Sequence, residues 1–113
     1  MKFILNESLA MLGIKNVVIG IAKNVDPHAP LPASFLKKQK EMEKWALNCD
    51  IDEVSDTPVI QGYKDLLQSV GRSVKENPPT VLALIRNIRH RGSFPNINSI
   101  IDIYNVESLH SLL

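Results

Sequence analysis

The sequence predicts a single domain of the α+β class, with helices and strands mixed along the chain. Residues 14–25 are rich in valine and isoleucine and alternate weakly, which is typical of a buried strand. Later stretches instead repeat apolar residues at helical spacing and are separated by glycine and proline. The length of 113 residues suits one domain, which can bury roughly two-thirds of its unfolded surface without disulfide or metal support.

The first quarter of the chain is predicted to run strand, short helix, strand. A short apolar strand at 2–5 precedes a helical turn that Asn6 caps and Gly13 ends. The second strand is the stretch 14–25. Three prolines then fall within residues 26–32, and proline cannot donate the hydrogen bonds of a sheet, so this segment is predicted to be a loop.

The rest of the chain is predicted to be mainly helical. The predicted helices cover residues 34–48, 58–70, 80–91 and 98–113. An acidic connector at 49–57 separates the first two helices and is predicted to hold a short strand at 51–54. Pro58 suits the first turn of a helix, and Gly92 suits the end of one.

The last predicted helix carries two polar residues among apolar ones. Its apolar residues fall all around the helix axis, which is typical of a buried helix. Asp102 and Asn105 are three residues apart and share one face. A buried carboxylate needs a partner, so we expect Asp102 to meet an arginine, a lysine or backbone N–H groups. Two interpretations stay open: both residues cap neighbouring loops, or both line a ligand pocket.

The final residues, Leu112 and Leu113, are apolar and are followed by no polar tail. This pattern indicates either a chain cut within a larger domain or an apolar helix end that a partner covers. We therefore expect a second copy of the chain, or another protein, to contact the C-terminal helix.

Charge is unevenly distributed, although the net charge is only +1. Residues 41–56 hold six acids and one base, whereas residues 72–91 hold five bases and one acid. The five bases are Arg72, Lys75, Arg86, Arg89 and Arg91. This asymmetry favours either two differently solvated surfaces or a basic surface that contacts the phosphates of RNA.

Composition excludes several classes of protein and site. The chain is 44% hydrophobic and 22% charged, which is ordinary for a soluble globular domain. No apolar run is long enough for a membrane helix or a secretory signal, so a cytoplasmic protein without membrane contact is predicted. The only cysteine, Cys49, excludes a disulfide framework and a paired-cysteine zinc site.

The chain also lacks the common sequence motifs of enzymes. It contains none of the glycine-rich nucleotide loops, metalloprotease motifs or nucleophile elbows. The three histidines do not have the spacing of metal ligands. No metal site, no cofactor and no catalytic residue is therefore predicted.

Residues 61–109 resemble a known family: the tRNA-binding and editing domain of the phenylalanyl-tRNA synthetase β-subunit. That domain is built from the third and fourth modules of the subunit, and freestanding proteins consist of it alone. The resemblance is strong over about half of the chain and weak over residues 14–58. The matching features are the helix from Gly62–Tyr63 to Gly71, the helix start Pro79–Thr80, the basic end Arg89–His90–Arg91–Gly92, the segment Pro95–Asn96–Ile97–Asn98, and Asp102 with Tyr104–Asn105.

The resemblance implies an α+β fold with a mixed-sheet, β-sandwich-like core and packed helices. It also implies a pocket that accepts a wrongly attached amino acid at the 3′ end of tRNA and hydrolyses the ester. Asn98 and Asn105 match pocket-lining positions, and Asp102 shares the face of Asn105. The histidine and glutamate that complete the editing site of the synthetase lie further downstream. Residues 1–113 are thus expected to form an incomplete domain that needs those residues for hydrolysis.

Two hypotheses of function follow from the sequence. In the first, the protein binds tRNA or the aminoacyl end of mischarged tRNA, using the pocket residues Asn98, Asp102 and Asn105 and the five bases of residues 72–91. In the second, it is a non-catalytic relative that binds a small amino-acid-like ligand or a protein partner.

Overall fold

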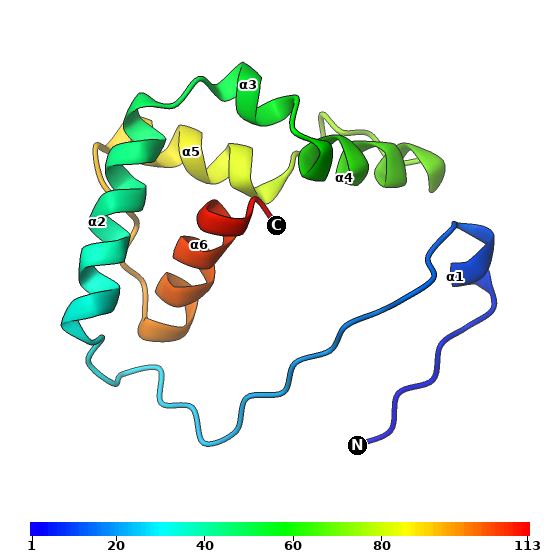
Figure 1. Ribbon diagram of the computed structural model, residues 1–113, viewed down its shortest axis with the longest axis horizontal. Helices are drawn as coiled ribbons and strands as arrows, with labels where there is room; N and C mark the ends of the chain where they lie inside the picture. Colours follow the sequence, from blue (N-terminus) through cyan, green and yellow to red (C-terminus); the bar gives the residue numbers. More distant parts are fainter.

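The computed structural model describes residues 1–113 and contains six helices and no strand (Figure 1). The helices are α1 (Ser8–Met11), α2 (Ala33–Asn48), α3 (Ile51–Ser55), α4 (Pro58–Ser69), α5 (Thr80–Arg91) and α6 (Ser99–Ser111). The prediction of an α+β fold with a mixed-sheet or β-sandwich-like core is therefore wrong, because the chain is all-helical.

The segment 14–25, which was predicted to be a strand, is extended but pairs with nothing. From Lys15 to Val25 no backbone group makes a hydrogen bond to another backbone group. The apolar side chains of the segment are exposed, and Val18 is 96% exposed. Valine and isoleucine favour a strand only where a neighbouring strand shares its hydrogen bonds and another layer covers its side chains. The structure provides neither, and the strand predicted at 2–5 fails for the same reason.

The short strand predicted at 51–54 is also wrong, because these residues form helix α3. The side chain of Asp50 accepts hydrogen bonds from the backbone N–H groups of Asp52, at 2.9 Å, and Glu53, at 3.4 Å. Such an N-cap satisfies donors that a new helix leaves free. The acids Asp52 and Glu53 lie in the first turn, where the helix dipole favours negative charge.

The core lies where α2, α5 and α6 pack against one another (Figure 1). Ile85 and Ile88 of α5, Ala46 of α2 and Val106 of α6 are fully buried there. Burial of one such valine or isoleucine side chain contributes roughly 1.5–3 kcal/mol. Helix α3 packs against α5 and α4, and α4 contributes one buried residue, Ile60, to the core.

Helix α5 follows its sequence prediction, whereas α6 departs from it. The predicted apolar stripe of α5 is buried, and Gly92 ends the helix with a left-handed φ of 80°. Helix α6 buries only the face that contacts α2 and α5. Its other face is open, with Tyr104 58% and Ile103 44% exposed. The prediction of a helix buried all round is therefore wrong, since no described element packs against that second face.

The N-terminal third runs away from the three-helix core (Figure 1). It is tied to the start of α6 by two hydrogen bonds, from Ser99 N–H to the Pro27 carbonyl at 3.0 Å and from Ser99 Oγ to the Asp26 carbonyl at 3.1 Å. The radius of gyration is 16.3 Å, larger than the ~13 Å of a compact chain of this length. The extended segment accounts for the difference.

None of the six helices combines the length and the apolar character that crossing a bilayer would need.

Candidate functional site

The three polar residues predicted to line a pocket serve the start of α6 instead. Asn98 is the N-cap of the helix, and its side chain accepts a hydrogen bond from the Ile101 N–H at 3.0 Å. Asp102 is 6% exposed, and its carboxylate accepts the Ile97 N–H at 2.9 Å. Asn105 is half-buried, and its side chain makes no hydrogen bond. The expected burial of Asp102 and its backbone partner are confirmed, and Asp102 fits the loop-capping interpretation. For Asn105 that interpretation is wrong, because its side chain bonds to no loop.

Two side chains of α2 hold the same loop from the other side. Glu43 accepts the Phe94 N–H at 2.9 Å, and Gln39 donates to the Asn96 side chain at 3.2 Å. Partial burial alone would raise the pKa of Glu43. The hydrogen bond from Phe94 and the nearby Lys40 ammonium outweigh that effect, so the pKa of Glu43 lies below its ordinary value. The Pro95–Asn98 segment is thus fixed by protein groups from two helices.

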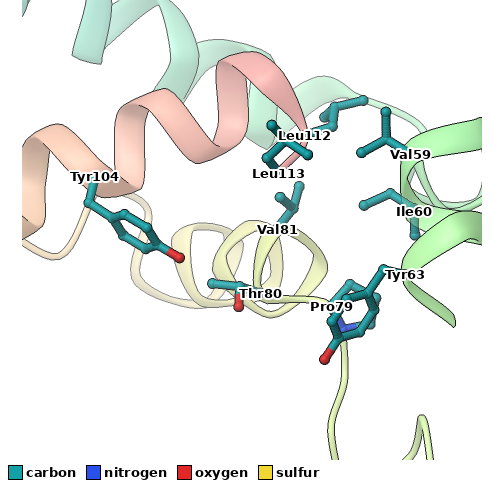
Figure 2. Close-up of a pocket in the computed structure, with 9 residues that line it drawn as sticks. All are labelled: Val59, Ile60, Tyr63, Pro79, Thr80, Val81, Tyr104, Leu112 and Leu113. Carbon is teal, nitrogen blue, oxygen red and sulfur yellow. The ribbon is translucent and has the colours of Figure 1, made fainter. Parts of the chain in front are cut away.

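An apolar cavity lies elsewhere, between α4, the start of α5 and the end of α6 (Figure 2). Its volume is about 250 Å³. The lining residues are Val59, Ile60, Tyr63, Pro79, Thr80, Val81, Tyr104, Leu112 and Leu113. In Figure 2 the aliphatic side chains of α4 and the α6 end face Val81, while the Tyr63 ring lies beside Pro79. Neither Asn98, Asp102 nor Asn105 lines this apolar cavity, so the structure does not bring the predicted pocket together.

The five predicted RNA-contacting bases are not one continuous patch. Arg89 is committed to the end of α2: its Nε donates to the Ala46 carbonyl at 2.9 Å, and its guanidinium also donates to the Cys49 carbonyl. A cation at a helix C-terminus satisfies free carbonyls there. Arg72 lies apart, in a cavity shared with Leu12 and the apolar side of α4. Arg91 is exposed at the end of α5.

Lys75 and Arg86 do line one cavity, together with a third cation, Lys64. The three line a cavity of about 370 Å³ between the end of α3, helix α4, the 71–79 loop and α5. We call this the basic cavity; its lining is Ser55, Lys64, Val74, Lys75, Pro78, Pro79, Leu82 and Arg86. No carboxylate lines it, and none of its three cations takes part in an ion pair. No acid of the chain therefore pairs directly with these three cations.

Local structure explains why these cations line the same cavity. Lys64 of α4 donates from Nζ to Ser55 Oγ at 2.5 Å, which holds the ammonium at the end of α3. Gln61 Nε2 donates to the Ser55 carbonyl at 2.9 Å and fixes the same corner. Pro78 and Pro79 form a stiff wall, because the proline ring restricts the backbone. Arg86 lies on the exposed face of α5, opposite the buried stripe.

Sequence reasoning missed Lys64 and Glu43. Lys64 lies on the polar side of an amphipathic helix, where an exposed lysine is ordinary. Its distance in the sequence from Lys75 and Arg86 does not predict that the three line one cavity. Glu43 belongs to the acidic stretch that was assigned to a solvated surface, yet its side chain is only 14% exposed. Only the packing of α2 against the 92–98 loop reveals its role.

No three side chains of histidine, cysteine, aspartate or glutamate gather in a way that could hold a metal ion. No protein-family model, no curated protein and no solved structure matches this chain.

Proposed function

We propose that the protein binds tRNA through the face that carries Lys75 and Arg86. The observation that supports the proposal most strongly is the grouping of these two bases with Lys64, free of ion pairs and free of neighbouring carboxylates in the cavity lining. RNA presents one negative charge per nucleotide, and unpaired cations on a shared surface bind it by releasing counterions. The resemblance of residues 61–109 to a tRNA-binding domain gives the class of nucleic acid. The cytoplasm, where tRNA acts, is the proposed compartment.

The proposal is for binding rather than for ester hydrolysis. Hydrolysis of an aminoacyl ester needs a positioned water and a donor for the developing oxyanion. Asn98 and Asp102 are occupied by backbone hydrogen bonds at the start of α6. The apolar cavity contains no charged side chain that could direct water. Deacylation of mischarged tRNA by residues 1–113 is therefore expected to equal the uncatalysed rate.

The binding proposal can be tested by fluorescence anisotropy with labelled tRNA over a series of salt concentrations. The test variant is Lys75→Gln with Arg86→Gln, and the matched control is Lys37→Gln with Lys44→Gln. The control lysines are exposed on α2 and form no side-chain hydrogen bond or ion pair, so both variants lose the same charge.

Three or four phosphate contacts predict a slope of log K against log salt of about −2 to −3. The test variant should lower the size of that slope by about 1–2, and the control should leave it unchanged. Equal loss in the two variants would show that net charge alone matters and would refute a specific surface. No binding at low salt would refute the proposal as a whole.

A second candidate function, binding of a small apolar or amino-acid-like ligand, is favoured by the apolar cavity. A volume of about 250 Å³ with aliphatic walls and the hydroxyls of Tyr63, Thr80 and Tyr104 suits one small ring or branched chain. Val59→Phe should fill this space, whereas Leu66→Phe changes a position two turns further along the same helix, at the same exposure of 41% and outside this cavity. Ligand-observed NMR with a panel of amino acids should detect binding that only Val59→Phe abolishes.

Self-association through the C-terminal helix stays a prediction. The open face of α6, with Ile100 43% and Tyr104 58% exposed, is the surface that such contact would use.

A further inference from the structure

The basic cavity has the chemistry of a site for a single phosphate group. Its three cations come from three different parts of the fold: Lys64 from α4, Lys75 from the 71–79 loop and Arg86 from α5. Because the three line one cavity, their side chains can turn toward one tetrahedral anion and donate to different oxygens of it. A volume of about 370 Å³ accommodates a phosphate with part of its ester group.

We propose that a phosphate monoester or diester binds in the basic cavity, held by Lys64, Lys75 and Arg86. Arg86 supplies the planar donor pair that matches two phosphate oxygens, and the two lysines act as point charges. The Ser55 hydroxyl, which already accepts from Lys64, is free to donate its own hydrogen to the bound anion. This site extends the proposed function, because the phosphate would come from tRNA. The source would be the tRNA backbone or the 5′ end of the tRNA, and this part of the inference rests on the proposed function.

The charge of the lining strengthens the argument for an anion. Three cations and no carboxylate line the basic cavity. Glu76 follows Lys75 in the sequence but does not line the cavity. Each additional negative charge on a bound anion adds to its attraction to these cations. Affinity should therefore rise with the charge of the anion, from chloride to sulfate and dianionic phosphate.

Half of the residues that line the cavity have side chains that cannot compete with an anion for the three cations. Val74, Pro78, Pro79 and Leu82 carry no side-chain acceptor, so Ser55, water and the anion are the remaining partners. Their apolar surface lowers the local dielectric constant and strengthens each charge contact relative to open solvent.

The test uses the whole 113-residue chain and inorganic phosphate as the probe, followed by two-dimensional amide NMR. Saturable shifts should be concentrated at Ser55, Lys64, Lys75, Leu82 and Arg86. Lys64→Gln should weaken phosphate binding about tenfold, and Lys37→Gln should leave it unchanged. Arg86→Lys keeps the charge but removes the planar donor pair, and it should weaken binding less than Lys64→Gln with Arg86→Gln.

Comparison of adenosine with adenosine 5′-monophosphate then tests whether the phosphate is the group recognised. The nucleotide should shift the same amides, and the nucleoside should not. Shifts spread evenly over all exposed lysines, or equal phosphate affinity in Lys64→Gln and the parent, would overturn the inference.

A separate arm distinguishes this inference from the proposed function. If the phosphate is that of tRNA, excess inorganic phosphate should displace tRNA, and Lys64→Gln should weaken tRNA binding. If tRNA binds and Lys75→Gln with Arg86→Gln weakens it, but Lys64→Gln does not, the phosphate site is refuted and RNA binding stands. If phosphate binds in the cavity and tRNA does not, the site stands with a small phosphorylated ligand, and the proposed function is refuted.

Discussion

Replacing Asp102 by alanine should destabilise the protein by about 1–4 kcal/mol. The carboxylate is 6% exposed and accepts the Ile97 N–H at 2.9 Å, so the substitution leaves that donor without a partner. An unsatisfied donor of this kind costs about 1–3 kcal/mol. Asp102 also lies in the first turn of α6, where a negative charge adds about 0.3–1 kcal/mol that alanine removes. The total is a large part of the roughly 5–15 kcal/mol that stabilises a typical domain.

Urea denaturation followed by the fluorescence of Trp45, which packs against the core, measures this cost. The matched control is Asn105→Ala, one turn further along α6, where the side chain is half-buried without a hydrogen bond. Its effect should stay within about 0.5 kcal/mol. Asp102→Asn keeps an acceptor for Ile97 and should fall between the two. Equal unfolding midpoints for Asp102→Ala and Asn105→Ala would refute the loop-capping role.

Three further predictions concern the rest of the chain. The pKa of Glu43 is lowered in the folded state, so its stabilising contribution is present above its ordinary pKa of 4.5 and is lost as pH falls through the folded value. The difference in unfolding free energy between the parent and Glu43→Gln should therefore shrink in acid, and a constant difference would argue against the Phe94 contact. Hydrogen exchange followed by mass spectrometry should find the amides of 15–25 unprotected and those of α5 strongly protected, whereas protection of 15–25 would mean that the segment is paired. Arg89→Gln should lower the free energy of unfolding, measured with heat or urea, by about 1 kcal/mol or more, because the carbonyls at the end of α2 lose a charged donor. An unchanged unfolding midpoint would mean that Arg89 does not stabilise the end of α2.

Helices with clear start or stop residues could be predicted from the sequence. Pro58 marks the first residue of α4, Gly92 ends α5 with a positive φ, and Asn98 caps α6. Each of these signals acts within one turn of the chain and needs no distant partner. Helix α3 carried a comparable signal that was overlooked: Asp50 is followed three residues later by Glu53, the spacing of a capped helix start.

Features that depend on distant contacts could not be predicted in this way. The segment 14–25 has the composition of a strand, but a strand forms only with a partner, and composition does not supply one. Lys64 lines the same cavity as Lys75 and Arg86 because the 71–79 loop connects α4 to α5 beside it. Arg89 was predicted to contact RNA because its partners within the protein are far away in the sequence. Its hydrogen bonds to Ala46 and Cys49 span 43 and 40 residues, so no local pattern reveals them.

The pocket residues illustrate the same limit. The burial of Asp102 followed from its position among apolar neighbours on one helix. Its role did not, because a buried carboxylate at a helix start satisfies either a ligand or the preceding loop equally well. The hydrogen bond to Ile97 decides between the two interpretations.

Lysine acetylation footprinting, with and without tRNA, tests the central claim most directly. A water-soluble acetylating reagent modifies exposed ammonium groups, and peptide mass spectrometry reports the extent at each lysine of the unaltered protein. Saturating tRNA should protect Lys64 and Lys75, which line the basic cavity, and should leave Lys37 and Lys44 of α2 as reactive as before. Protection of Lys37 and Lys44 with Lys64 and Lys75 still reactive would contradict the account and would place the RNA on α2.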